Sequence, residues 1–175
     1  MKKDGQYSMD DYILRQVDVR LCLRESSPLY SSEAITSAES AVNIMASEMR
    51  SLDNEHLCVV NLNSKMQPIN FSVASIGGLN YTCVEARSVF KSAILSNAAS
   101  IILMHNHPSG DATPSKDDIS VTIRMIEAGR LLGIYLMDHV IVGAQTGECF
   151  SFHQQYPEYF KGDLDYQVIQ KIINS

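Results

Sequence analysis

Two histidines and an aspartate occur at spacings that suit a metal site. His105 and His107 are two residues apart, and Asp118 follows eleven residues after His107. Two imidazoles and a carboxylate are a ligand set of catalytic zinc, which keeps a further coordination position open for water. These three residues therefore predict one bound Zn²⁺ per chain, held by two neutral ligands and one anionic ligand.

The segments around these residues indicate how they are brought together. Residues 100–104 form a short apolar run that is typical of a buried strand. Since side chains alternate along a strand, His105 and His107 at its end project to the same side. Ser115 has the position of a helix N-cap, which puts Asp118 in the first turn, where the helix dipole favours an ionised carboxylate. The spacing places the ligands on a strand end and on the helix start that faces it.

The rest of the chain predicts a mixed α/β pattern, without repeats or low-complexity segments. The predicted elements are a half-buried strand at 17–23, a helix from a capping box at 36–39 to about 51, a hairpin of strands at 57–62 and 67–76, a helix from a second capping box at 82–85 to about 98, the strand that leads to His105, a helix from Ser115 to Gly133, strands at 134–142 and 149–152, and a last helix near 163–173. We expect an N-terminal extension with one strand at 1–35, a domain at 36–155 and a helical tail at 156–175.

Composition narrows the class of protein. Lys and Arg number 14 against 20 Asp and Glu, and the net charge of −6 argues against a chain that mainly neutralises nucleic-acid phosphates. The sequence has no apolar run of membrane-spanning length and no charged-then-apolar leader, so we predict a cytoplasmic protein without a membrane partner. The cysteines form no C-x-x-C pair, and we predict reduced, buried and inert thiols at Cys22, Cys58, Cys83 and Cys149.

The metal motif resembles that of a known family. The segment from His105 to Asp118 fits the His-x-His-x7-Ser-x2-Asp pattern of the JAB/MPN (JAMM) metalloproteases at every specified position. The strings HNHPSG at 105–110 and EAGRLLGI with DHVIVG at 127–143 resemble the RadC branch of that superfamily, and the resemblance covers roughly residues 50–153. It implies a cytidine-deaminase-like fold, in which a central mixed β-sheet is flanked by helices.

The resemblance also implies roles for further residues. The family uses a glutamate at the start of its first core strand, which corresponds to Glu55; Glu85 is the competing candidate, but its predicted capping box gives it a structural role. By this likeness, Glu55 carries a proton from the metal-activated water to the leaving amine. Ser115 would donate a hydrogen bond to the oxyanion. The resemblance thus implies a zinc-dependent peptidase or isopeptidase-type hydrolase that acts on a peptide or protein.

The other residues that could carry chemistry do not form a recognisable second site. Asp138 and His139 are strand neighbours that face opposite sides, so they cannot converge on one site, and we predict a structural role for them. His56 and His153 have no partner pattern. The letters H-N-H at 105–107 are consecutive, unlike the dispersed residues of an HNH nuclease. The Pro-Cys-x-x-Cys of zinc deaminases and the H-E-x-x-H of zincins are both absent.

One alternative belongs to another functional class. RadC-like proteins are often labelled as DNA repair proteins, and the chain could be a non-catalytic interaction module in DNA metabolism. Long RadC forms carry a helix-hairpin-helix unit, whereas residues 1–50 lack the glycine-containing hairpins that such a unit needs. Direct DNA binding is therefore in doubt, and the intact ligand set favours a hydrolase. A homodimer is left open: the strand at 17–23 pairs either with the core sheet, which we favour, or with another subunit.

Overall fold

The computed structural model describes residues 16–23, 34–50, 52–77, 84–144 and 146–161. The helices and strands in chain order are α1 (Ala38–Arg50), β1 (His56–Leu62), β2 (Pro68–Ile76), α2 (Ala86–Leu95), β3 (Ser100–His107), α3 (Lys116–Leu132), β4 (Tyr135–Gly143), β5 (Cys149–Ser151), α4 (Phe152–Gln155) and the 3-10 helix η1 (Pro157–Phe160). The strands form one sheet in the order β2-β1-β3-β4-β5. Only β3 and β4 are parallel, which confirms the predicted mixed sheet flanked by helices.

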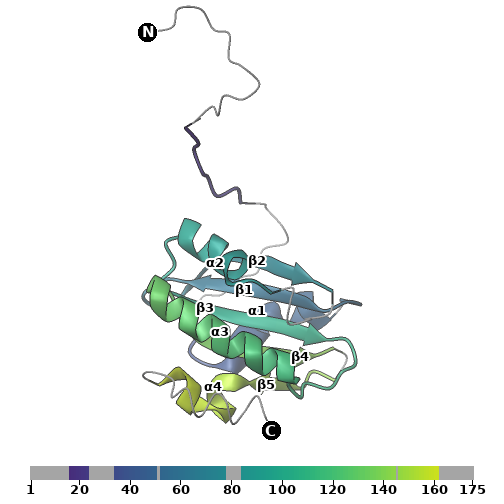
Figure 1. Ribbon diagram of the computed structural model, residues 1–175. Coiled ribbons are helices and arrows are strands. Elements are labelled where there is room, and N and C mark those ends of the chain that lie inside the picture. Colours follow the sequence, from purple (N-terminus) through teal and green to yellow (C-terminus); the bar gives the residue numbers. More distant parts are fainter. Residues whose placement is uncertain (1–15, 24–33, 51, 78–83, 145, 162–175) are drawn as a thin grey trace, which may run out of the picture.

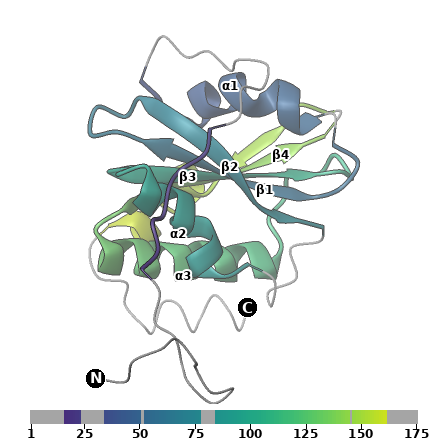
Figure 2. The same cartoon turned by 90° about the horizontal axis from the view of Figure 1, so that it is seen from above.

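The sheet lies between two layers of helices (Figures 1 and 2). Figure 2 shows α1 on one face and α2 with α3 on the other. Alternation along the central strands divides the core accordingly: Val59 and Leu103 pack on the side of α2 and α3, whereas Val60 and Ile102 pack on the side of α1. Because both faces are covered, β3 is buried along almost its whole length.

Helix α3 begins and ends with local signals that the sequence contains. The Ser115 side chain accepts a hydrogen bond from the Asp118 backbone, and the Asp118 carboxylate accepts one from the Ser115 backbone N–H, which is a complete capping box. Gly133 closes the helix in the left-handed conformation, with φ of 69°. The predicted helix from Ser115 to Gly133 is therefore confirmed, and so is the hairpin, whose strands β1 and β2 are antiparallel.

The predicted starts of two other helices are wrong in detail. Helix α1 is capped by Ser37 and Ser40, which exchange backbone-to-side-chain hydrogen bonds of 3.1 and 3.2 Å, one residue later than the predicted box at 36–39. The predicted box at 82–85 lies mostly outside the described residues. Helix α2 starts at Ala86, and Glu85 is its N-cap residue without a side-chain capping bond.

The N-terminal strand prediction is also wrong. Residues 17–23 belong to no strand, and Val17 and Leu23 are 77% and 71% exposed. An alternating sequence favours an extended strand, but a strand needs a partner for its backbone groups, and no described segment lies beside this one. The predicted helix near 163–173 lies outside the described residues.

The cysteine prediction holds only in part. Cys58 is buried, and burial raises the pKa of its thiol to about 11, so this cysteine fits an inert core residue. Cys22 and Cys149 are exposed, in contrast to the prediction, while Cys83 lies outside the described residues. Among the described residues, no helix is long and apolar enough to cross a membrane.

Candidate metal centre

The three predicted ligands meet where β3 ends and α3 begins. His105 Nε2 lies 2.9 Å from His107 Nε2 and 3.2 Å from Asp118 Oδ1. His107 Nε2 lies 3.7 Å from Asp118 Oδ2, and the three residues together form a group that could hold a metal ion. His105 and Asp118 are buried and His107 is half-buried, so the group opens toward solvent on the side of His107.

A backbone contact determines which nitrogen of His107 carries a proton. Its Nδ1 lies 2.6 Å from the carbonyl oxygen of Asp111. A carbonyl oxygen can only accept, so Nδ1 must donate. In the neutral imidazole, Nε2 is then unprotonated, and its lone pair points to the centre of the group.

A longer hydrogen-bond chain determines the tautomer of His105. The Thr122 hydroxyl donates to the carbonyl oxygen of Asp118, at 2.6 Å, so it must accept from His139 Nδ1, also at 2.6 Å. Nε2 of neutral His139 then accepts from His105 Nδ1, at 2.8 Å. His105 is therefore left with an unprotonated Nε2, the same atom that faces Asp118. This series of hydrogen bonds starts at Thr122 on α3, passes through His139 on β4 and ends at His105 on β3.

Asp118 completes the group with an oxygen that lacks a donor. Its Oδ2 accepts from the backbone and the hydroxyl of Ser115, at 2.7 and 2.6 Å. Its Oδ1 is buried and has no hydrogen-bond partner among the described residues. A buried carboxylate oxygen without a donor is costly unless a cation satisfies it. In a tetrahedral zinc site with bonds of about 2.0–2.1 Å, ligand atoms lie about 3.3 Å apart, close to the separations in this group. The residues therefore fit a bound divalent cation.

The electrostatics of the group favour a cation in the same way. Burial lowers the pKa of His105 well below its usual range, and His139 lowers it further. Burial also lowers the pKa of His139 to about 4, so both buried imidazoles are neutral at pH 7. Burial alone would raise the pKa of Asp118, but its contacts with His107 and Ser115 and the nearby His105 hold it far below its usual range. The neighbouring Asp118 carboxylate raises the pKa of His107, so a metal ion and a proton compete for Nε2.

Strand register places Glu55 beside this group. Leu57 pairs with His105 in the antiparallel ladder, so continuing the register brings Glu55 opposite His107, on the same face. Glu55 is half-buried, and its charge contributes to the raised pKa of His107. Asn106 fixes the chain on both sides of Glu55: it accepts from the backbone of His56, at 2.8 Å, and donates to the carbonyl oxygen of Asn54, at 2.9 Å.

Comparison with known proteins agrees with this arrangement. The family model of the RadC-like JAB domain matches residues 35–157. The chain belongs to the RadC-like JAB domain family. That match contains the strand, the helix and the residues that form the candidate metal centre.

Several curated relatives of this RadC-like JAB domain are UPF0758 proteins. One from Caldanaerobacter subterraneus subsp. tengcongensis is 52% identical over 114 residues, which cover 65% of this chain and 49% of the relative. One from Geobacillus sp. is 50% identical over 111 residues, covering 63% of this chain and 49% of the relative. One from Clostridium acetobutylicum is 46% identical over 114 residues, covering 65% of this chain and 50% of the relative. The chain thus spans about half the length of the curated relatives it matches.

Ser115 and Glu85 have clear structural contacts in this RadC-like JAB domain. The single hydroxyl proton of Ser115 is donated to Asp118, so Ser115 both caps α3 and holds the carboxylate. Donation to an oxyanion would require this hydroxyl to turn away from Asp118, and that role stays a prediction. Glu85 forms an ion pair with Arg87 and is not part of the metal group.

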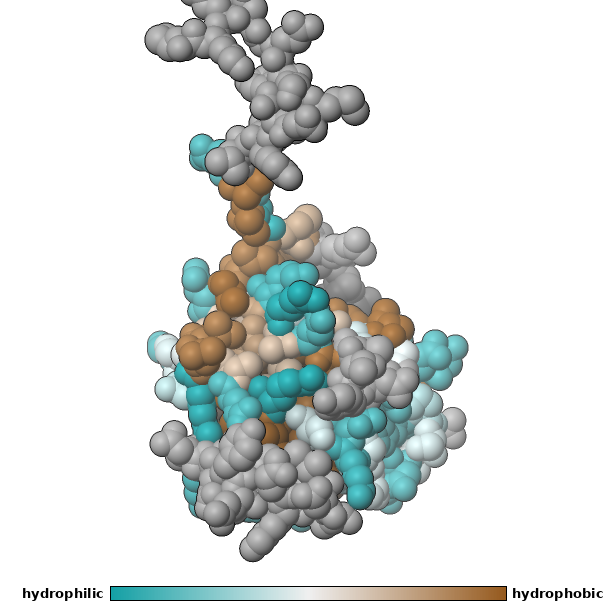
Figure 3. Space-filling model, in the orientation of Figure 1, coloured by the Kyte–Doolittle hydropathy of each residue, from teal (hydrophilic) through white to brown (hydrophobic). Residues whose placement is uncertain are grey.

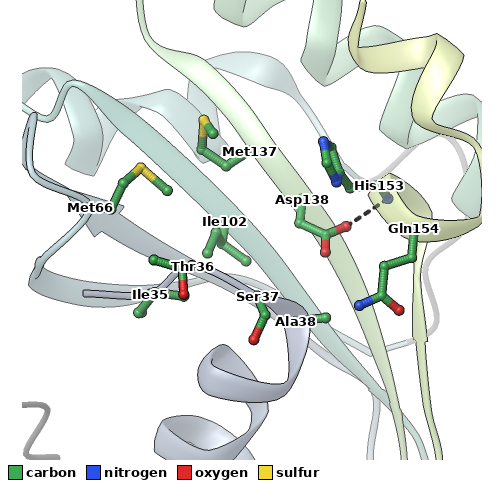
Figure 4. Close-up of a pocket in the computed structure, with 10 residues that line it drawn as sticks. All are labelled: Ile35, Thr36, Ser37, Ala38, Met66, Ile102, Met137, Asp138, His153 and Gln154. Atoms are coloured by element: carbon green, nitrogen blue, oxygen red, sulfur yellow. Dashed lines mark hydrogen bonds between the residues drawn. The ribbon is translucent and has the colours of Figure 1, made fainter. Parts of the chain in front are cut away.

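His139 and Asp138 lie on opposite faces of β4, as the sequence predicts. His139 contacts a metal-ligand candidate, whereas Asp138 accepts from the Ser151 hydroxyl at 2.6 Å and from the His153 backbone at 2.9 Å. Figure 4 shows Asp138 beside a cavity of about 250 Å³ on the α1 side of the sheet. Sequence reasoning missed the contact of His139 with His105, because it depends on the register of β4 against β3.

A groove borders the metal centre on the side of β5. It has a volume of about 320 Å³ and is lined by Asp111–Thr113 and Glu148–Phe150. The Asp111 carbonyl oxygen in this wall is the group that holds His107. The groove and the candidate metal centre thus share Asp111, although His105, His107 and Asp118 do not line the groove.

Proposed function

We propose that this RadC-like JAB domain is a zinc-dependent peptidase or isopeptidase-type hydrolase. The observation that carries the proposal is the convergence of three ligand atoms, from His105, His107 and Asp118, next to a half-buried glutamate. Two imidazoles, one carboxylate and a nearby general base are the groups that hydrolysis of an amide requires at neutral pH.

When bound, zinc would supply a Lewis acid that polarises a carbonyl and brings the pKa of water close to neutrality. Glu55 accepts a proton from the attacking water and delivers it to the leaving amine. Ser115 turns its hydroxyl from Asp118 to the carbonyl oxygen as negative charge develops there. His139, Thr122 and the Asp111 carbonyl keep the two ligand histidines in the required tautomers.

Metal analysis of the purified full chain tests the ligand assignment. We expect one zinc per chain in the wild type and almost none after His107→Ala or Asp118→Ala. The same ligand types also hold non-haem Fe(II), so the analysis identifies the element as well as its amount. Equal, near-zero metal in all three proteins would contradict the proposal.

Activity is tested with a set of fluorogenic peptides and with isopeptide-linked conjugates. Glu55→Gln should retain the metal and lose hydrolysis by about 10²-fold or more, because the general base is removed. Glu85→Gln is the matched control and should change neither property, since Glu85 pairs with Arg87 outside the metal group. Salt-sensitive binding of duplex DNA by a protein that shows no hydrolysis would instead favour the interaction-module alternative.

A further inference from the structure

The first described segment carries an apolar surface that the other described residues leave exposed. Val17, Val19, Leu21 and Leu23 are 77%, 69%, 39% and 71% exposed, and they alternate with Asp18, Arg20 and Cys22. Figure 1 shows the segment standing clear of the folded domain, on the side where β2 lies, and Figure 3 shows the apolar side chains along it. In an extended strand, all four apolar side chains would share one face.

The sheet has a matching edge at β2. This strand is the outermost one, and among the described residues no strand pairs with its outer side. Its nine residues include no charged side chain, although edge strands are usually protected by charges against pairing with another chain. Bulges occur near both of its ends, which leaves the middle, Asn70–Val73, as the regular part of the edge.

The two faces of β2 differ in the same way as the two faces of the segment. On the α1 side, Phe71 packs against the core, and Val73, which pairs with the core residue Cys58, is 47% exposed. On the opposite side, Ser72 and Asn70 form hydrogen bonds with Ser92 of α2 and with Ser96 at its C-cap. A strand formed by residues 17–23 would therefore continue both faces, with its apolar side chains beside Val73.

We propose that residues 17–23 pair with the β2 edge of a second copy of this chain, so that two copies exchange strands in a symmetric dimer. Each copy has both a donor strand and an acceptor edge, and within the described residues both lack a partner. A two-fold dimer fills both pairs at once. The inference goes beyond the proposed hydrolysis and does not depend on it.

The connection is long enough for such an exchange. Ile35 is held at the end of the β1–β2 hairpin by a hydrogen bond of 2.8 Å from its backbone to the carbonyl oxygen of Met66. Twelve residues lead from Leu23 to Ile35 and can span at most about 40 Å. The segment extends away from its own β2 in the structure, so the edge of a second copy is the partner that this geometry supports.

Complementation between two variants tests the exchange. A donor variant, Val19→Lys with Leu21→Lys, removes the apolar face of the segment, and an edge variant, Val73→Lys, puts a charge on the β2 edge. The changed side chains are exposed by 69%, 39% and 47%, so the fold should be retained, as an unchanged circular dichroism spectrum would show. Light scattering after size exclusion should find a wild-type dimer and monomers for each variant alone. Mixed in equal amounts, the variants should form a dimer again, because one intact donor meets one intact edge.

The control is Arg20→Ser on the polar face of the segment, which should leave the dimer intact. A wild-type chain that stays monomeric at every concentration would overturn the proposal, and so would variants that remain dimeric or do not complement each other. A monomer whose amides at 17–23 are protected from hydrogen exchange would also overturn it, since the segment would then pair with its own β2. Loss of hydrolysis alone leaves these readouts unchanged.

Discussion

Asp138 and His139 are chain neighbours on β4, and yet they belong to different parts of the protein. His139 faces α3 and is hydrogen-bonded to Thr122 and His105, so it forms part of the candidate metal centre. Asp138 faces α1 and accepts hydrogen bonds from Ser151 and His153 at the start of α4. The alternation of side chains along one strand thus separates a group that prepares a metal site from a group that stabilises the fold.

The first difference that the comparison predicts concerns metal binding. His139→Ala removes the acceptor that orients His105, and outer partners of this kind typically contribute about 10–100-fold to metal affinity. Asp138→Asn should leave metal affinity unchanged, although it alters the adjacent residue. Competition with a chromogenic zinc chelator measures both constants. Equal losses of affinity in the two variants would mean that the faces of β4 are not separate.

The second difference appears in the dependence of stability on pH. The pKa of buried His139 is lowered to about 4, whereas an unfolded histidine titrates near 6.5. The unfolded chain therefore binds more protons between these values, and the stability due to neutral His139 is present above pH 6.5 and lost as the pH falls toward 4. The difference corresponds to about 3 kcal/mol for this group. Urea unfolding of chelator-treated protein across this range should show the loss in wild type and a smaller one in His139→Gln.

A smaller effect is expected from the next residue of the chain of hydrogen bonds. Thr122→Val keeps the shape of the side chain but removes the hydroxyl that orients His139. We expect about a tenfold loss of metal affinity, at the lower end of the range for outer partners. Thr122→Ser restores the hydroxyl and should bind metal like the wild type. If serine and valine behave alike, packing at this position matters and the hydrogen bond does not.

The smallest effect concerns Asp138 itself. Asp138→Asn cannot accept both hydrogen bonds in the same way, because one carboxylate oxygen is replaced by a donor. We expect a decrease of about 1 kcal/mol in the free energy of unfolding, the usual contribution of one hydrogen bond. Denaturant titration at pH 7 measures it, with the metal content of the same sample as an internal comparison.

The sequence predicts those parts of the site whose residues are close together in the chain. The ligands at His105, His107 and Asp118 lie within a single strand–loop–helix unit, and their spacing alone predicts the group. The role of His139 depends on the alignment of β4 with β3, where His139 pairs with Leu103 after a register shift, and spacing does not encode that shift. The sequence does not predict the role of Thr122 for the same reason, since Thr122 acts on the site only through its hydrogen bond with His139.

In the N-terminal segment the local signal is present, but the predicted strand is not formed. The alternation at 17–23 predicts a strand with two different faces, but a strand exists only where another backbone completes its hydrogen bonds. The predicted start of α1 is wrong by one residue for a simpler reason. Several nearby serines and threonines can cap a helix, and the structure uses Ser37 and Ser40 in place of the predicted pair.

X-ray absorption at the zinc edge of the purified full chain tests the central claim most directly. The account predicts nitrogen and oxygen neighbours at about 2.0–2.2 Å, with the outer-shell scattering of two imidazoles and no sulfur. Sulfur neighbours at about 2.3 Å would assign the metal to cysteines instead and would contradict the site formed by His105, His107 and Asp118.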